Sequence, residues 1–518
     1  MEACLTQMDR QRPTADATQT DRRSAISWIS KAVLACIGLG FLWRLLRYCQ
    51  GFPIWGDEAM LLLNILNRDY AGLTQHLRFA QVAPLFFLWL EKSAILIFGT
   101  SEWSVHLFPM LAGILALAVF WNTCRTNFRP LVAGLAVSIF AVSYYPVRHA
   151  CEVKPYSFDV CFAVLFLWIA LNQLCNPACN RWLIVLIAVT PLAVFSSYPS
   201  VFVAGSVSLV LLPAVRNGSW TQCGLWAAFN VVLLASFAIH FGMIGHHQID
   251  ASEAARTREF LRQYWKDAFP PEELSRWPLW LGNVFTGNML AYPIGANHGG
   301  SSLTLLLVLI GSVSIWRRGQ RSLLALCWLP FALNLIAAVM EKYPFGDSAR
   351  ITLHLAPFIC ILMAHGIAQV LDWIRSPRWQ SRLLVVIYVL LLGCGIFGIA
   401  RDIARPFKTE HDRDVRKVAR ELVEQIEIGE TAVLNHDRDE DLLSEFLWNL
   451  RAAHLDLRWR NAPNDAGSYW LVECSHQEPA LPSASNGWHV TQSNVRPIPP
   501  ENAKMHTVYC RWTRIVRD

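Results

Sequence analysis

Long stretches without Asp, Glu, Lys or Arg recur along this 518-residue chain and restrict the folds open to it. Roughly 17–25 apolar residues in a helix span the hydrocarbon core of a bilayer, and these stretches are long enough to do so. They cover 103–124, 130–147, 160–180, 182–215, 217–249, 277–316, 322–340, 351–371 and 383–400. The stretch 182–215 is too long for one helix, and Ser196-Ser197-Tyr198-Pro199 divides it into two. With a first apolar segment at 32–43, we predict a polytopic α-helical membrane protein with about 11 transmembrane helices.

The overall composition excludes an ordinary soluble globular protein. Hydrophobic residues make up 54% of the chain and charged residues only 16%, with a mean hydropathy of +0.31. The net charge of +6 does not indicate nucleic acid as a partner, because the basic residues form short clusters between apolar stretches. The 14 cysteines show no regular spacing and predict no disulfide framework.

The basic clusters predict the orientation of the helices. Residues 1–25 are expected to be a cytoplasmic tail preceding a retained signal anchor. The other clusters fall on the same side if 83–98 does not cross the membrane: Arg125/Arg129, Arg181, Arg216, Arg317/Arg318/Arg321 and Arg375/Arg378/Arg382. Because Glu91-Lys92 lies in the middle of 83–98, we expect that segment to be interfacial or re-entrant. The outer loops are then 47–102, 148–158, 244–276 and 341–350.

The composition changes after residue 400. Residues 401–518 are charged and mixed, with helical patterns in VRKVARELVEQIEI and DLLSEFLWNLRAA and strand patterns in TAVLNH, SYWLVEC and HTVYCRWTRI. Alternating helices and strands predict a small α/β domain outside the membrane. We therefore divide the chain into the tail 1–25, a transmembrane catalytic domain 26–400 and an extracytoplasmic domain 401–518.

Polar residues that could perform chemistry gather on the predicted outer side. They are Asp57 and Glu58 in the first outer loop, Arg148, His149, Glu152, Lys154 and Tyr156 in the second, Tyr198 at a helix end, and Glu341, Lys342, Asp347 and Arg350 before a late helix. Carboxylates beside a bilayer often mark a functional site. A carboxylate could deprotonate an acceptor hydroxyl while Lys154 and Arg350 hold the phosphate of a lipid-linked donor.

Structural alternatives exist for the same residues. Asp57 could cap the helix that begins at AMLLLNIL, and Glu152 could be a surface acid. Lys154 and Arg350 could extend to the membrane interface. The adjacent His246-His247 lacks a spaced third ligand, so we predict no metal site there.

Three ordered motifs resemble the GT-C superfamily of membrane glycosyltransferases that use polyprenyl-phosphate sugars. GDEAMLLLNIL, then Phe98-Gly99, Ser101-Glu102 and a helix with Pro109 and Gly113, is similar to the opening of glycosyltransferase family 39. That family includes the protein O-mannosyltransferases and aminoarabinose transferases, and the related bacterial lipopolysaccharide-core transferases share the pattern. HACEVKPYSFDV is similar to the second-loop motif, and YPFGDSARITLHLAPFICIL to a late motif.

The match has two departures and one substitution. Val82-Ala83-Pro84 replaces the family's His-Pro-Pro, with Gln81 as the nearest polar residue, and His106 stands where Arg is common. Lys154 takes the place of the usual Arg, whereas Glu152, Pro155 and Tyr156 keep their positions. Arg350 and Pro357 match the late motif.

The resemblance implies an inverting glycosyltransferase that moves a sugar from a polyprenyl-phosphate donor to a lipid, glycan or protein acceptor. Asp57 would be the general base or its organiser, with Glu58 and Glu152 as further catalytic acids, and burial would raise the Asp57 pKa. Lys154, Arg350, His149, Tyr156 and Tyr198 would bind donor phosphate and substrate. No cofactor is firmly implied, although some members of the superfamily use a divalent cation at the acidic pair.

Two other functions remain open from the sequence. One is a ligase or polymerase that uses a polyprenyl-diphosphate glycan, and the other is a lipid or solute transporter. The charges gather at one membrane face and the halves show no inverted repeat, which favours an enzyme. We expect the bacterial inner or plasma membrane as its location, with the active site on the extracytoplasmic face and membrane lipids as neighbours.

Overall fold

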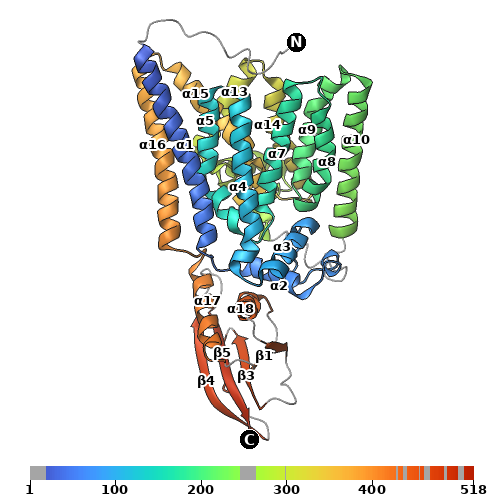
Figure 1. Cartoon of the computed structure of the whole chain (residues 1–518), viewed down its shortest axis with the longest axis vertical. Helices are drawn as coiled ribbons and strands as arrows, with labels where there is room; N and C mark the ends of the chain where they lie inside the picture. The colour runs from blue at the N-terminus through green and yellow to red at the C-terminus, as the bar shows by residue number, and fades with distance from the viewer. Residues whose placement is uncertain are drawn as a thin grey trace.

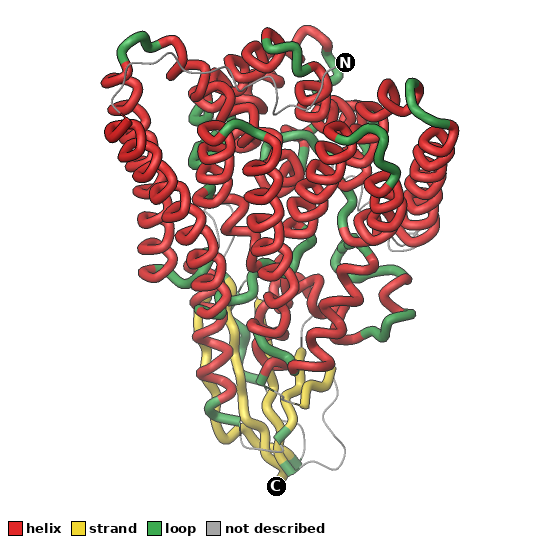
Figure 2. Tube along the Cα trace, turned by 45° about the horizontal axis from the view of Figure 1, so that its top comes forward, coloured by secondary structure: helices red, strands yellow, loops and turns green. Residues whose placement is uncertain are grey.

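The computed structural model describes residues 19–245, 264–297, 299–426, 430–435, 440–453, 456–459, 467–475, 477–482, 487–499 and 507–518. Most of the chain forms a bundle of roughly parallel helices, and a small sheet domain projects from one end of the bundle (Figure 1). Figure 2 shows that the strands are confined to this end. The predicted fold class, a polytopic helical membrane protein with a C-terminal α/β domain, is confirmed.

The helices that run through the bundle follow the apolar stretches. They are α1 (Gln19–Cys49), α4 (Glu102–Asn127), α5 (Pro130–Val142), α6 (Tyr144–Arg148), α7 (Tyr156–Cys175), α8 (Arg181–Ser196), α9 (Ser200–Arg216), α10 (Trp220–Phe237), α13 (Ser302–Arg317), α14 (Arg321–Val339), α15 (Ala356–Trp373) and α16 (Pro377–Ala404). Further helices at the domain end of the bundle are α2 (Gly56–Asn67), α3 (Leu85–Phe98) and α12 (Trp277–Thr286).

The number of membrane-crossing segments agrees with the sequence. Among the described residues, seven helices are long and apolar enough to cross a membrane, α5 and the segment Tyr144–Cys151 pass the same test together as a pair bent by 52°, and α8, α9 and α13 are shorter apolar helices. Together these account for the eleven predicted spans. The stretch 277–316 gives only one of them, because its first part forms α12 and a loop before α13 begins at Ser302.

The segment 83–98 does not cross the bundle. It forms α3, which lies beside α2 at the end of the bundle near the sheet domain (Figure 1). Lys92 on α3 donates to the carbonyl oxygens of Ile65 (3.0 Å) and Leu66 (3.4 Å) at the end of α2. A cation there satisfies carbonyls that have no partner within the helix.

Hydrogen bonds between buried side chains and close contacts at glycines hold the helices of the bundle together. At the domain end of α1 and α16, the Trp43 indole and the Arg47 guanidinium both donate to Asp402, each at 2.6 Å. Gly311 on α13 and Gly366 on α15 allow these helices to approach closely. A Cβ at Gly366 would lie 2.0 Å from the carbonyl oxygen of Leu307.

The basic loops gather at the end of the bundle away from the sheet domain. Arg129 at the start of α5 and Arg318 after α13 both pair with Asp372 at the end of α15, at 3.3 and 3.2 Å. α2, α3 and the sheet domain occupy the opposite end (Figure 1). The charge asymmetry that the sequence predicts is therefore present in the bundle.

The C-terminal domain is a five-stranded mixed sheet with two helices. The strands are β1 (Thr431–Asn435), β2 (Asp456–Trp459), β3 (Ser468–Ser475), β4 (Trp488–Ile498) and β5 (Val508–Arg517), in the order β2-β1-β3-β5-β4. β1 pairs in parallel with β2 and β3, and β5 lies antiparallel between β3 and β4. The helices α17 (Glu410–Val423) and α18 (Glu440–Ala452) pack on the sheet, and α18 also contacts α2. The sequence patterns did not predict β2 and β4. β4 is largely exposed and its buried and exposed residues alternate irregularly, so it lacks the regular alternation of apolar and polar residues that indicates a strand.

Candidate active site

The acidic pair Asp57-Glu58 lies in the first turn of α2, and the two carboxylates point to different partners. Trp55 is the residue before the helix, and its backbone N–H donates to Oε2 of Glu58 at 3.4 Å. Glu58, not Asp57, therefore caps this helix. Asp57 is free of the capping role that the sequence left open for it.

Asp57 is held by two cations and an amide. Nζ of Lys154 lies 2.8 Å from its Oδ1, and Nη1 of Arg350 lies 3.4 Å from its Oδ2. The Gln81 amide donates to Oδ1 at 3.4 Å and accepts from Lys154 at 2.7 Å. The Asp57 side chain is 28% exposed and that of Lys154 only 9%. The carboxylate therefore remains reachable while its cations are mostly shielded from water.

Each partner of Asp57 comes from a different part of the chain. Lys154 lies in the loop between the bent span and α7, and Arg350 lies in the turn Ala349–Leu355 that precedes α15. Gln81 follows two non-glycine residues in the left-handed region, Phe79 (φ 63°) and Ala80 (φ 51°). Such strain is typical of positions where the surroundings fix a functional conformation. Here it directs Gln81 to Asp57 and Lys154.

Aromatic rings line the guanidinium of Arg350. Its centre lies 5.5 Å from the Trp55 ring and 5.0 Å from the Trp265 ring, and Nη2 donates to the Tyr264 hydroxyl at 3.3 Å. These contacts hold the cation without neutralising it. Arg350 is therefore positioned to bind an anion together with Lys154.

The pKa of the Asp57 carboxyl is lowered, contrary to the expectation from the sequence. Burial by itself raises this pKa, but the charges of Lys154 and Arg350 and the hydrogen bonds from Lys154 and Gln81 outweigh it. A bound phosphate would share the same two cations and add a negative charge nearby. Both effects would raise the pKa of Asp57 and strengthen it as a base.

Glu58 belongs to a second, fully buried ion cluster. Its Oε1 accepts from the backbone N–H of Val153 at 2.6 Å, and its Oε2 forms a short ion pair with Lys408. Lys408 Nζ also lies 3.4 Å from Glu152, whose other oxygen is 2.6 Å from Nδ1 of His149. The ring of His106 lies 3.6 Å from Glu58. This cluster ties the first outer loop, the second outer loop and the C-terminal segment together.

The pKa values of both buried acids lie below their usual range. Burial raises the pKa of Glu58, and the charge of Lys408 with the contact from His106 outweighs that effect. Burial also raises the pKa of Glu152, and His149 and Lys408 lower it well below the ordinary value. Both carboxylates are therefore held ionised among cations, which suits positioning better than proton transfer.

Lys408 is the principal residue that the sequence analysis missed. It follows α16 in ARPFKTE, where a basic residue is ordinary for the end of a membrane helix. Its side chain is only 2% exposed and its nitrogen also lies 5.3 Å from the Trp55 ring. The one local sign of a role for Lys408 is its position in the segment that joins α16 to the C-terminal domain.

Of the remaining predicted residues, Tyr156 lies beside the Glu58 cluster and Tyr198 lies apart from it. The Tyr156 ring meets the His149 ring edge-on at 5.3 Å, and His149 stacks on Tyr145. Tyr198 stacks on His240 at 5.0 Å, and no described contact joins it to Asp57 or Glu152. His246-His247 lies outside the described residues.

The acidic pair does not fit a divalent cation in this arrangement. The Asp57 carboxylate is paired with Lys154 and Arg350, and the Glu58 carboxylate is paired with Lys408. Within the described ranges, no group of three or more His, Cys, Asp and Glu side chains is arranged to hold a metal ion.

Comparisons with known proteins agree with this architecture. Residues 82–241 match the sequence model of the dolichyl-phosphate-mannose-protein mannosyltransferase family. No curated protein matches the sequence. The apo structure of ArnT from Cupriavidus metallidurans superposes with a TM-score of 0.50 at 13% identity, covering 87% of this chain and 93% of ArnT.

Two further solved structures are similar over most of this chain. ArnT from the same organism bound to undecaprenyl phosphate gives a TM-score of 0.49 at 12% identity, covering 93% of this chain and 98% of ArnT. The Archaeoglobus fulgidus oligosaccharyltransferase tethered to an acceptor peptide gives 0.43 at 12% identity, covering 85% of this chain and 64% of that enzyme. The resemblance found in the sequence motifs is confirmed, and the fold is that of the GT-C membrane glycosyltransferases.

Proposed function

We propose that this chain, which has the fold of the GT-C membrane glycosyltransferases, transfers a sugar from a polyprenyl-phosphate donor to an acceptor hydroxyl on the outer face of the membrane. The observation that supports it most is the Asp57 carboxylate between Lys154 and Arg350. The Asp57 carboxylate can remove a proton while the two cations beside it bind a phosphate. The description of ArnT bound to undecaprenyl phosphate is consistent with a donor of this class.

The proposed reaction is a single displacement. Asp57 takes the proton from the acceptor hydroxyl while the hydroxyl oxygen attacks C1 of the sugar. The bond between C1 and the phosphate oxygen breaks, and polyprenyl phosphate leaves. Lys154 and Arg350 stabilise the negative charge on the departing phosphate. Stabilising a charge that develops on the leaving group is among the largest contributions that an enzyme site can make. Attack opposite the leaving group inverts the configuration at C1.

The placement on the outer face rests on charge asymmetry. The basic loops lie at the other end of the bundle from α2, α3 and the C-terminal domain (Figure 1), and clusters of Lys and Arg favour the cytoplasmic side. The charges of the Asp57 site lie at one end of the bundle and not midway along it. This favours an enzyme at the membrane surface over a transporter.

Replacing Asp57 with Asn tests the proposal. A general base contributes roughly 10²- to 10⁴-fold, so the D57N turnover number should fall by at least about 100-fold. The KM for the donor should not rise, because Lys154 and Arg350 lose their competing carboxylate. The assay is transfer from radiolabelled polyprenyl-phosphate sugars in membranes that contain the full chain.

The matched control is Asp69→Asn, since Asp69 is an exposed acid in the same loop whose Oδ1 accepts from Gly72 N–H at 2.7 Å. D69N should keep wild-type turnover. An unchanged rate in D57N would remove Asp57 from the reaction and defeat the proposal. A polyprenyl-diphosphate donor should be inert; if it is used in preference, the chain is a ligase or polymerase.

A further inference from the structure

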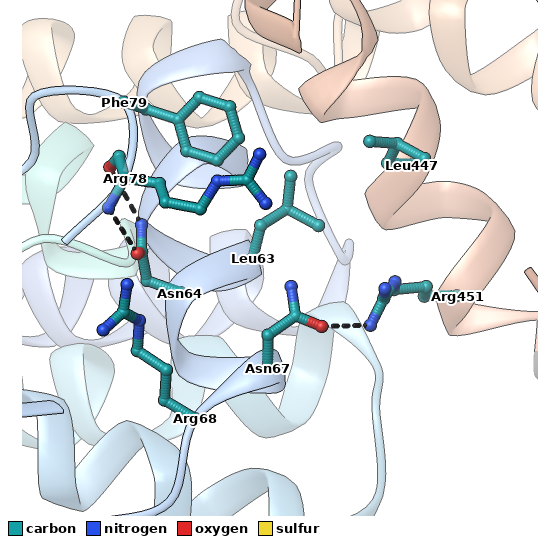
Figure 3. Close-up of a pocket in the computed structure, with 8 residues that line it drawn as sticks. All are labelled: Leu63, Asn64, Asn67, Arg68, Arg78, Phe79, Leu447 and Arg451. Carbon is teal, nitrogen blue, oxygen red and sulfur yellow. Dashed lines mark hydrogen bonds between the residues drawn. The ribbon is translucent and has the colours of Figure 1, made fainter. Parts of the chain in front are cut away.

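A cavity lies at the C-terminal end of α2, between this helix and the C-terminal domain. It encloses about 290 Å³ and is lined by Leu63, Asn64, Asn67, Arg68, Arg78, Phe79, Leu447 and Arg451. Figure 3 shows guanidinium groups approaching from three elements: the end of α2, the loop that follows it, and α18. Asn64 is seven residues after Asp57, so the cavity begins about 10 Å from it along the helix.

The backbone of Arg78 is fixed in place by Asn64. The Asn64 amide oxygen accepts from the Arg78 N–H at 2.8 Å, and its nitrogen donates to the Arg78 carbonyl at 3.1 Å. The next residue, Phe79, is the first of the two left-handed residues that lead to Gln81. One short segment therefore places Arg78 at this cavity and Gln81 beside Asp57.

The opposite wall is supplied by the C-terminal domain. Nη1 of Arg451 on α18 donates to Oδ1 of Asn67 at 2.6 Å, and Leu447 faces Leu63 across the cavity (Figure 3). The Nε of Arg451 is buried without a hydrogen-bond partner among the described residues. The domain thus adds a third, half-buried guanidinium to a cavity that Arg68 and Arg78 already line.

Two of the three guanidinium groups that line the cavity, those of Arg68 and Arg451, form no ion pair with a described carboxylate. Arg68 donates instead to the carbonyl of Gly72. Burial lowers the pKa of Arg68, and the nearby charge of Arg78 lowers it further. Burial also lowers the pKa of Arg451. Cations brought together at such a cost are typical of a site for an anion.

We infer that this cavity binds a phosphate group of the acceptor, which anchors the acceptor while its hydroxyl reaches Asp57. Arg is the residue best suited to bidentate phosphate binding, and Leu63, Phe79 and Leu447 supply an apolar wall for the attached sugar or chain. The inference rests on the proposed function, because it names the substrate class for the Asp57 site. Binding at a group remote from the reacting bond can orient the acceptor hydroxyl.

Binding of small phosphate compounds to the full chain in neutral detergent tests the inference independently of catalysis. The probes are inorganic phosphate, glucose 1-phosphate and short-chain phosphatidylglycerol, with the unfolding temperature as readout at constant ionic strength. Inorganic phosphate and glucose 1-phosphate should stabilise the wild type. The R68Q/R451Q double variant should bind them at least about tenfold more weakly, since a hydrogen bond to a charged group is worth roughly a factor of ten or more.

The matched control is Arg276→Gln, because Arg276 is a cation on a separate loop whose side chain is 68% exposed. R276Q should bind the probes like the wild type. Equal binding in R68Q/R451Q, or no stabilisation of the wild type, would overturn the inference. Stabilisation by phosphatidylglycerol alone would assign the cavity to a structural lipid and would also overturn it. Because no probe is a sugar donor, these outcomes are independent of whether D57N retains turnover.

Discussion

At the scale of single residues, Lys408 shows how a charge can act through its neighbours. It lies between Glu58 and Glu152, which would otherwise face each other as buried like charges. Glu58 in turn caps α2, and Asp57 is the preceding residue. We therefore assign Lys408 as a positioning residue that keeps the first turn of α2 in place.

Replacing Lys408 with Met should impair both stability and turnover. Removing one partner of a buried ion pair costs about 3–5 kcal/mol, because the other charges stay buried. In the folded fraction, the turnover number should fall by about 100-fold, since small displacements of catalytic groups have effects of this size. Thermal unfolding and single-turnover transfer measure the two effects separately.

The control is Lys417→Met, an exposed lysine on α17 that should change neither quantity. K408R keeps the charge and should recover part of the turnover, which loss of stability alone would not explain. Wild-type turnover in folded K408M would show that the Glu58 cluster does not position Asp57.

At the same scale, the residues that the sequence did identify share a feature. Asp57, Lys154 and Arg350 come from three motifs that kept their order, and the fold brings the charged groups of Lys154 and Arg350 within 3.4 Å of the Asp57 carboxylate. Tyr198 lies between α8 and α9, outside these three motifs. Its stacking on His240 is a tertiary contact that the local pattern could not predict.

At the scale of elements, α3 explains why an acid can lie in an apolar helix. Glu91 is fully buried, and neither of its oxygens has a hydrogen-bond partner in the described part of the chain. Burial raises its pKa well above the ordinary value, and the charge of Glu58 raises it further. Both effects favour the neutral form of Glu91, and this form is the one that α3 can bury.

This pKa predicts a pH dependence of stability. The folded state holds the Glu91 proton at pH values where the unfolded chain, with a glutamate pKa of about 4.3, has released it. The contribution of Glu91 to stability therefore falls as the pH rises above that value. Glu91→Gln imitates the neutral acid, so wild type should lose stability relative to E91Q as the pH rises from about 5 to 8.

The measurement is the difference in unfolding temperature between wild type and E91Q as a function of pH, in the same detergent. Glu273→Gln is the control, because that acid lies on an exposed loop. Its difference from wild type should stay constant over this range. Parallel curves for wild type and E91Q would mean that Glu91 is ionised in the folded protein.

At the scale of the whole molecule, the C-terminal domain is part of the site and not an appendage. α18 packs against α2, Lys408 enters the Glu58 cluster, and Arg416 on α17 donates to the carbonyl of Gly51 at 2.9 Å and lies 3.6 Å from Glu102. The domain therefore contacts both ends of the first outer loop. Its side of the membrane is then also the side of the site.

A pair of cysteines in this domain tests which side that is. Cys474 on β3 and Cys510 on β5 are directly opposite each other, with their sulfur atoms 2.7 Å apart. Disulfides form in oxidising compartments outside the cytoplasm. On the outer face, an oxidant such as a thiol–disulfide oxidoreductase should take two electrons and two protons from these thiols and join them.

We expect a Cys474–Cys510 disulfide in protein isolated under thiol-blocking conditions, detected as a linked peptide by mass spectrometry. C474S should release Cys510 for alkylation after denaturation, and Cys49, an exposed thiol at the end of α1, serves as the unpaired reference. Two alkylated thiols in the wild type would place the domain on the reducing side and contradict an outer-face site.

The sequence by itself determined the helical bundle, the charge asymmetry between its ends and that the segment of α3 does not cross the bundle. These follow from apolar length and from the positions of charges along the chain, which are local properties. Only the tertiary structure decided which acid caps α2, that Lys408 completes the buried cluster, and that α18 closes an arginine-lined cavity. Each of these depends on contacts between segments far apart in the sequence, and Glu58 and Lys408 are separated by 350 residues. No periodicity in a single chain records such a pairing.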